Sequence, residues 1–269
     1  MISFPNVKIN LGLNIIEKRP DGYHNIETVF YPVQFNDILE IIKSDKFKFI
    51  NTGIKIDCNI EQNLCYKAWQ LVDKKYGIGP VKIILHKNVP YGTGLGAGSS
   101  NAAFTIKSLN ELFALNLTED EQISIASLLG ADCAFFIKNK PVFAIEKGDK
   151  FSNIEISLKN YYLLLCLPKF SVKTSEAYNN CLPQKPIKNI PEILKTEIHY
   201  WKDYLVNDFE NTVFTKYSDL KKLKEDLYLN GSIFALMSGS GSAIYGIFDY
   251  EPKNLKFKVE CDYKIIKLQ

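Results

Sequence analysis

The sequence predicts a two-domain α/β protein. Its 269 residues can bury a substantial core and suit one large or two modest domains. Residues 3–60 read as strands, so the opening of the chain is β-rich. The apolar run YYLLLCL at 161–167 follows a turn at 147–150 and reads as a strand buried on both faces. We therefore expect an N-terminal domain over residues 1–157 and a C-terminal domain over residues 158–269.

The expected elements follow from hydrophobic periodicity and from the residues that interrupt it. Strands are expected at 7–15, 28–33, 38–42, 81–86, 161–167, 234–237 and 243–248. Helices are expected at 63–76 before Gly77, directly after the glycine-rich segment 89–100, at 118–129 and at 218–229. The sequence TEDE at 118–121 predicts a capping box at the start of the third of these helices. Three prolines in residues 183–191 predict a loop.

The bulk composition is that of an ordinary globular protein. Hydrophobic residues make up 46% of the chain and charged residues 23%, which disfavours disordered and fibrous classes. No apolar run reaches membrane-spanning length, and the N-terminus lacks the features of a signal peptide. We therefore expect a cytoplasmic protein.

The cysteines and the charges argue against a disulfide-stabilised protein, a metal site and a nucleic-acid-binding protein. Six scattered cysteines without a CxxC pair read as reduced thiols, and three histidines give little support to a metal site. The net charge of +3 is too small to indicate nucleic-acid binding. Because Arg19 is the only arginine, a polyphosphate would have to be held by backbone N–H groups, lysines and a metal ion.

The segment VPYGTGLGAGSSNAAFTIKSLNELF, residues 89–113, indicates phosphate binding. Four glycines, at 92, 94, 96 and 98, let the backbone take positive φ and lie close to a ligand. In the helix that follows, Ala102, Ile106, Leu109 and Phe113 form one apolar stripe that should be buried. A helix anchored in this way directs its free N–H groups and positive dipole end at the glycine loop.

Better-known glycine loops do not fit this segment. No lysine follows the glycines, which excludes GxxxxGK[ST], and GxGxxG fails because position 97 is Ala and position 99 is Ser. The alternative is a glycine-rich turn that only caps a helix. Glycine at every second position favours the phosphate loop.

Lys8 and Asn10 are candidate active-site residues near the N-terminus. They are two residues apart on an expected strand, so both side chains leave the same face, while Val7, Ile9 and Leu11 leave the other. The alternative is that they are solvated polar residues on the outer face of the strand. The functional interpretation requires a partner carboxylate.

Asp132 in GADCAFF, residues 130–136, can supply that carboxylate. It lies between a helix-ending glycine and an apolar run, where an unpaired carboxylate would be costly to bury. It is therefore expected to be a helix N-cap, an ion-pair partner or a catalytic group. Opposite Lys8 it would accept the proton of a hydroxyl while the ammonium stabilises the developing alkoxide.

Tyr23 and His24 follow the turn RPDG and form a candidate recognition site for a flat ring. An aromatic side chain beside an imidazole can stack on such a ring and hydrogen-bond its edge. The alternative is a turn cluster whose polar groups satisfy one another.

Taken together, these motifs make the chain resemble the GHMP kinases, the superfamily of galactokinase, homoserine kinase, mevalonate kinase and phosphomevalonate kinase. The resemblance rests on the Lys8 strand, the loop PYGTGLGAGSSNAA at 90–103 and MSGSGSAIYGIF at 237–248, and it covers effectively the whole chain. Within the superfamily it is strongest to the family of 4-diphosphocytidyl-2-C-methyl-D-erythritol kinases. The discriminating segments are KINLGLNIIEKRPDGYHNIET, EQNLCYKA, LGADCAFF and SVKTSEAY.

The resemblance implies an N-terminal domain like ribosomal protein S5, a C-terminal α/β domain and an active site in the cleft. It implies transfer of the γ-phosphoryl group of ATP to the 2-hydroxyl of a cytidine diphosphate alcohol in isoprenoid precursor synthesis, with Mg²⁺ bridging the phosphates. The expected partners are these small molecules, with neither nucleic acid nor membrane. Lys8 and Asp132 would form the catalytic pair, and Asn10, Tyr23 and His24 would line the substrate pocket.

The resemblance also assigns the residues that would hold ATP. Asn63 would lie near the adenine, and residues 239–242 match the third motif of the family. The phosphates would be wrapped by Pro90, Tyr91, Gly92, Thr93, Gly94, Leu95, Gly96, Ala97, Gly98, Ser99 and Ser100. No carboxylate is assigned as a metal ligand, so the protein would offer Mg²⁺ a hydroxyl of Ser99 or Ser100.

The chain departs from the family pattern at Ala134, where Pro is frequent, and at Ser240 and Ser242 in the third motif. Two alternative functions also fit the sequence. One is another GHMP kinase for a small alcohol such as mevalonate or homoserine, which offers no nucleobase for Tyr23 and His24. The other is a non-catalytic nucleotide- or RNA-binding module, for which a charge of +3 gives little reason.

Overall fold

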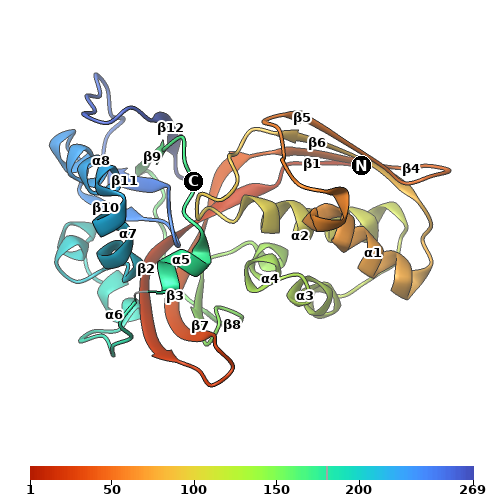
Figure 1. Ribbon diagram of the computed structural model, residues 1–269, viewed down its shortest axis with the longest axis horizontal. Coiled ribbons are helices and arrows are strands. Elements are labelled where there is room, and N and C mark those ends of the chain that lie inside the picture. Colours follow the sequence, from red (N-terminus) through yellow and green to blue (C-terminus); the bar gives the residue numbers. More distant parts are fainter. Residues whose placement is uncertain (180) are drawn as a thin grey trace. The chain divides into compact units, whose positions relative to one another are not determined.

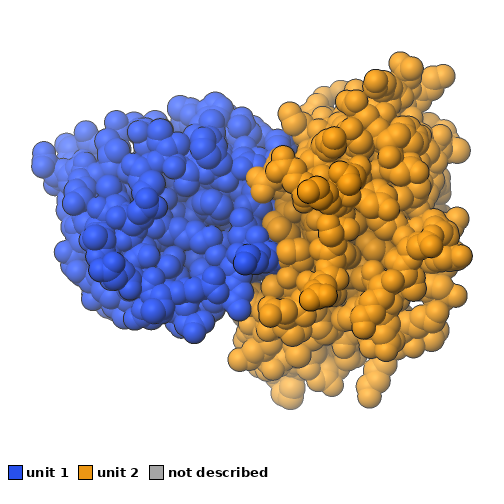
Figure 2. Space-filling model, turned by 180° about the vertical axis from the view of Figure 1, so that it is seen from behind, with its two compact units in different colours: residues 1–7, 35–91, 96–140 blue, residues 8–34, 92–95, 141–269 orange. Residues whose placement is uncertain are grey.

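The computed structural model describes residues 1–179 and 181–269, and these form two compact units. Unit 1 comprises residues 1–7, 35–91 and 96–140, and unit 2 comprises residues 8–34, 92–95 and 141–269 (Figure 2). Both units are assembled from segments that are discontinuous in the sequence. The expected division into residues 1–157 and 158–269 is one of consecutive segments, and it stays a prediction.

Unit 1 is a four-stranded sheet with helices against one of its faces (Figure 1). The strand order is β1-β4-β6-β5, and only the β5–β6 pair is parallel. The strands are β1 (Ile2–Ser3), β4 (Ile38–Lys43), β5 (Lys48–Gly53) and β6 (Val81–Lys87). The helices are η1 (Ile60–Gln62), α1 (Leu64–Tyr76), α2 (Ala97–Leu112), α3 (Glu119–Ser127) and α4 (Ala131–Lys138).

Local signals explain where the helices of unit 1 begin and end. Asn63 caps α1 by accepting the N–H of Cys65, and Gly77 ends the helix in the left-handed conformation, with φ +63°. The predicted capping box joins Thr118 and Glu121 at the start of α3. The predicted apolar stripe of α2 is buried at Ala102, Ile106 and Leu109, and Phe113 is half-buried just beyond the helix.

Unit 2 contains two four-stranded sheets and the remaining helices (Figure 1). One sheet has the order β2-β3-β7-β8, built from β2 (Asn6–Lys18), β3 (His24–Asn36), β7 (Val142–Ile145) and β8 (Lys150–Asn153). The other has the order β10-β11-β9-β12, built from β9 (Tyr162–Leu167), β10 (Phe234–Met237), β11 (Ile244–Phe248) and β12 (Asp262–Lys267). The helices are α5 (Thr174–Asn179), α6 (Ile190–Leu194), η2 (Ile198–Asp203), α7 (Phe209–Lys216) and α8 (Ser218–Leu229).

Most expected elements are present, the expected loop at 183–191 is too long, and α4 was not among the expected elements. β9 lies between β11 and β12 and is buried along nearly its whole length, as its apolar run predicted. The expected loop at 183–191 ends early, because Asn189 caps α6 and Pro191 fits its first turn. A helix in residues 130–138 was implied only by the alternative in which Asp132 is an N-cap; α4 forms there, directly after Gly130. Among the described residues, no helix has the length and apolar character needed to cross a membrane.

Candidate active site

The glycine loop adopts the backbone that its sequence predicted at three of its four glycines. Gly92, Gly94 and Gly96 have φ of +69°, +78° and +70°, a region that side chains disfavour. Gly98 is not in this region, because α2 begins at Ala97 and Gly98 belongs to its first turn. The prediction of positive φ is therefore wrong for Gly98, while the helix start directly at the glycine loop is confirmed.

Within unit 2, the middle of the glycine loop is held from two sides. The carbonyl oxygen of Gly94 accepts hydrogen bonds from Lys8 Nζ at 2.8 Å and from Ser238 Oγ at 3.0 Å. A Cβ added at Gly94 would overlap the carbonyl oxygen of Ser238. The backbone N–H of Lys8 also donates to the carbonyl of Leu95 at 3.0 Å. Only glycine fits this close approach between the loop and its neighbours.

Lys8 and Asn10 are buried, with 3% and 1% of their surface exposed. Their side chains leave the same face of β2, as predicted, and Lys8 Nζ donates to Asn10 Oδ1 at 2.7 Å. The ammonium also lies 5.1 Å from the ring centroid of Phe30. The alternative of solvated residues on an outer face is wrong, because the fold buries this face of the strand.

The third motif is anchored by a residue that sequence reasoning did not single out. Asn207 Nδ2 donates to the carbonyl oxygens of Met237 and Gly239, each at 2.8 Å. The hydroxyl of Ser240 lies 3.1 Å from that of Thr174. These bonds hold the turn that presents Ser238 to Gly94.

Within unit 1, Asp132 lies against the start of α2. A Cβ added at Gly96 would lie 3.4 Å from Asp132 Oδ2 and 3.0 Å from the ring of Phe136. Asp132 is in the first turn of α4, and the N-cap position is held by Gly130. The N-cap alternative for Asp132 is therefore wrong, because the helix begins two residues earlier than a cap at position 132 requires. A carboxylate in a first helical turn is stabilised by the helix dipole.

A pocket of about 200 Å³ in unit 1 lies beside the glycine loop. Asn63, Tyr91 and Gly98 are among its lining residues, so three of the residues expected to hold ATP share one cavity. The side chain of Asn63 is already used as the cap of α1, with Oδ1 accepting the N–H of Cys65 at 2.9 Å. Gly98 leaves room in the pocket, since an added Cβ would meet only Leu64 at 3.8 Å.

The entry to the glycine loop is fixed by a buried ion pair between Lys87 and Asp37. Asp37 Oδ1 also accepts the backbone N–H groups of Asn88 at 2.8 Å and Val89 at 2.9 Å. Burial lowers the pKa of Lys87, and the neighbouring Asp37 carboxylate opposes this shift. The pair thus sets the position of the residues just before Pro90.

In the turn after β2, Tyr23 and His24 differ in how far their rings are exposed. Tyr23 is 63% exposed, whereas the ring of His24 is stacked on Tyr178, with centroids 4.7 Å apart and an interplanar angle of 16°. Partial burial, followed by the charge of Lys18, lowers the pKa of His24. Arg19 is occupied within the same turn, where it pairs with Asp21.

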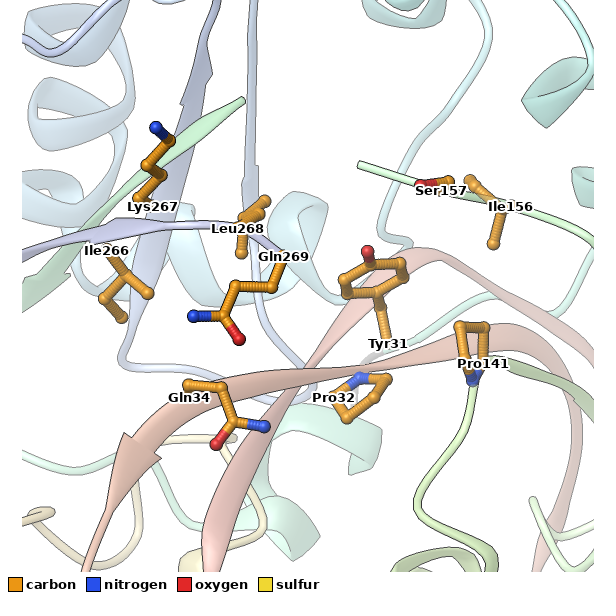
Figure 3. Close-up of a pocket in the computed structure, with 10 residues that line it drawn as sticks. All are labelled: Tyr31, Pro32, Gln34, Pro141, Ile156, Ser157, Ile266, Lys267, Leu268 and Gln269. Carbon is orange, nitrogen blue, oxygen red and sulfur yellow. The ribbon is translucent and has the colours of Figure 1, made fainter. Parts of the chain in front are cut away.

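Unit 2 also contains a pocket of about 250 Å³ that no predicted site residue lines (Figure 3). Its lining includes Tyr31, Gln34 and Gln269. The hydroxyl of Tyr31 accepts the backbone N–H of Leu158 at 3.1 Å. We assign this pocket no part in phosphate binding.

Two domain models of one family match the sequence. Residues 63–140 match the GHMP kinases N terminal domain, and residues 189–264 match the GHMP kinases C terminal domain. The chain belongs to the GHMP kinases. The resemblance inferred from the motifs is thereby confirmed, as is the expected two-domain α/β fold of the family.

This GHMP kinase is similar to curated relatives over nearly its whole length. The 4-diphosphocytidyl-2-C-methyl-D-erythritol kinase of Bacteroides thetaiotaomicron is 51% identical, with 93% of each chain covered. The enzyme of that name from Parabacteroides distasonis is 47% identical, covering 95% of this chain and 94% of the relative. A crystal structure of a 4-(cytidine 5′-diphospho)-2C-methyl-D-erythritol kinase has a TM-score of 0.79 at 29% identity, covering 92% of this chain and 90% of that one.

The site residues predicted for this GHMP kinase fall into separate groups. Lys8, Asn10 and Gly94 are together in unit 2, and Asp132 is beside Gly96 in unit 1. The pairing of Lys8 with Asp132 stays a prediction. Sequence reasoning missed Thr28, Asn207, Ser238 and Tyr178 as individual residues. Thr28, Ser238 and Tyr178 nevertheless lie in segments that carried the family resemblance, which was the available signal.

Proposed function

We propose that this GHMP kinase transfers the γ-phosphoryl group of ATP to the 2-hydroxyl of 4-diphosphocytidyl-2-C-methyl-D-erythritol. The observation that carries the proposal is the buried ammonium of Lys8, held on the carbonyl of Gly94 in the middle of the glycine loop. A cation fixed at this loop can stabilise the charge that develops as phosphate is transferred. We take the acceptor alcohol from the names of relatives that are up to 51% identical to this chain.

Asp132 is proposed as the general base. Its carboxylate would accept the proton of the acceptor hydroxyl while the oxygen attacks the γ-phosphorus and ADP leaves. Lys8 would stabilise the developing negative charge on the transferred group. The position of Asp132 beside Gly96, at the start of α2, supports this role, because the first N–H groups of that helix would point toward the phosphates of bound ATP.

Tyr23, His24 and Asn10 are proposed to bind the cytidine-bearing substrate, and we add Tyr178 to this group. His24 and Tyr178 present a pair of parallel rings beside the exposed Tyr23, and such surfaces suit a nucleobase. Asn10 already uses its amide on Lys8 and Thr28, so it would contact substrate through its second N–H. Mevalonate and homoserine contain no ring that these aromatic groups could recognise.

The pocket lined by Asn63, Tyr91 and Gly98 is proposed to take the base of ATP. Residues 90–100 would wrap its phosphates through backbone N–H groups. Among the described residues, no group of three or more acidic, histidine or cysteine side chains could hold a metal ion. Mg²⁺ would be bound by nucleotide oxygens, with a hydroxyl of Ser99 or Ser100 as the protein's contribution. Ser100 Oγ is buried and has no hydrogen-bond partner among the described residues. A cytoplasmic location fits the reaction and stays a prediction.

Incubation of the protein with ATP, Mg²⁺ and the cytidine diphosphate alcohol tests the proposal. The expected result is a new phosphomonoester signal in the ³¹P NMR spectrum, together with ADP. CDP should compete with the alcohol, and mevalonate and homoserine should give no product. Phosphorylation of either small alcohol at a comparable rate, without competition by CDP, would replace the proposed acceptor.

A further inference from the structure

Thr28 on β3 makes two hydrogen bonds that fix the orientation of a neighbouring amide. Its side chain is fully buried, and Oγ1 donates to the carbonyl oxygen of Gly12 at 2.6 Å. Because the hydroxyl proton is used in this bond, Oγ1 faces Asn10 as an acceptor. It receives the N–H of Asn10 Nδ2 at 2.8 Å.

This arrangement decides which end of the Asn10 amide meets Lys8. With Nδ2 held by Thr28, the oxygen Oδ1 is directed at the Lys8 ammonium, 2.7 Å away. The reverse orientation would place an NH₂ group against the ammonium, donor against donor. Phe30, two residues after Thr28 and on the same face of β3, lies beneath the same ammonium.

We propose that Thr28 is a positioning residue for phosphoryl transfer. It acts through Asn10, whose amide it orients so that the ammonium of Lys8 is held at the carbonyl of Gly94. The inference rests on the proposed role of Lys8 in catalysis. The three buried side chains form one chain of hydrogen bonds from the carbonyl of Gly12 to the glycine loop.

Loss of the Thr28 hydroxyl should therefore lower turnover and leave ATP binding unchanged. In Thr28→Val, a substitution of nearly equal volume, Asn10 Nδ2 loses its acceptor inside the protein. The amide either stays unsatisfied or turns its NH₂ group toward Lys8, which displaces the ammonium. A small displacement of a catalytic group lowers turnover steeply.

The experiment measures kcat, both KM values and the melting temperature for Thr28→Val and Thr28→Ser, each with Lys8 intact and in Lys8→Met. We expect Thr28→Val to lower kcat by about tenfold or more, with the KM for ATP within about threefold. Thr28→Ser keeps the hydroxyl and should retain kcat within about threefold. In Lys8→Met, Thr28→Val should lower kcat by no more than about twofold further, since the ammonium that it positions is gone.

Thr105→Val is the matched control for a purely structural effect. Thr105 is also fully buried and its hydroxyl also donates to a backbone carbonyl, that of Asn101 at 2.8 Å. It should lower the melting temperature as Thr28→Val does and leave kcat unchanged. If Thr28→Val does not fold, Thr28→Ala removes the same hydroxyl and takes its place in all comparisons.

The outcomes separate the inference from the proposed function. Low kcat in Lys8→Met combined with wild-type kcat in Thr28→Val would overturn the role of Thr28 alone. Equal losses of kcat from Thr28→Val with and without Lys8 would also overturn the role of Thr28, because the effect would then not depend on the ammonium. Unchanged kcat in Lys8→Met would overturn the catalytic role of Lys8 and the positioning role together.

Discussion

Lys8 and Ser238, from opposite ends of the sequence, donate hydrogen bonds to the same atom, the carbonyl oxygen of Gly94. The two donors come from β2 and from the turn that follows β10. A carbonyl held by both cannot turn toward the phosphate side of the loop without losing two buried hydrogen bonds. The conformation of the glycine loop in unit 2 is thus fixed by residues outside the loop.

Replacing Gly94 with Ala should disrupt this arrangement. The new Cβ would overlap the carbonyl of Ser238, in addition to the strain of φ +78°. Gly79→Ala is the matched control, since Gly79 has φ +77° and no atom within 4 Å of an added Cβ. The control should lose about 1–2 kcal/mol in the free energy of unfolding, the cost of the conformation alone. Gly94→Ala should lose more, and its kcat should fall; equal stabilities in urea unfolding would contradict the close approach.

Asp132→Asn should abolish most turnover while leaving ATP binding largely intact. The amide keeps the shape of the side chain but cannot accept a proton from the acceptor hydroxyl. We expect kcat to fall by roughly two to four orders of magnitude, the range for loss of a general base. Glu119→Gln is the control, because Glu119 is likewise an acidic residue in the first turn of a helix. Wild-type kcat in Asp132→Asn would remove Asp132 from the reaction.

Tyr178→Leu should weaken binding of the cytidine substrate without affecting ATP. Loss of the ring that stacks on His24 should raise KM for the alcohol by about tenfold, on the order of 1 kcal/mol for an aromatic pair. The KM for ATP should not change. Tyr217→Leu removes a ring stacked on Phe170 at the same interplanar angle of 16° and should leave both KM values unchanged. Steady-state kinetics with each substrate varied would show an equal effect of both substitutions if Tyr178 had no part in recognition.

Asp37→Ala should destabilise the protein strongly. It removes the partner of the buried Lys87 ammonium and the acceptor for the N–H groups of Asn88 and Val89. Breaking a buried pair in this way costs about 3–5 kcal/mol in the free energy of unfolding. The same substitution in the exposed pair of Lys222 and Asp219 should cost far less, because solvent screens that pair. Similar losses for both variants, measured by urea unfolding, would show that burial does not set the energy of the Lys87 pair.

The sequence by itself determined the features that depend on neighbouring residues. The capping box of Thr118 and Glu121, the helix end at Gly77 and the positive φ of Gly92, Gly94 and Gly96 follow from local backbone chemistry, and each was predicted. The common face of Lys8 and Asn10 follows from the two-residue period of a strand. The motifs that resemble the GHMP kinases indicated phosphoryl transfer from ATP.

Only the tertiary structure decided which distant groups complete the site. Thr28, Asn207 and Ser238 act through hydrogen bonds to residues far along the chain, and no local pattern shows which partner each of them binds. The tertiary structure also decided that the face of Lys8 and Asn10 is buried, which the alternating pattern left open. The physical reason is that a strand's period fixes which side chains share a face, whereas burial of that face depends on what the rest of the chain packs against it.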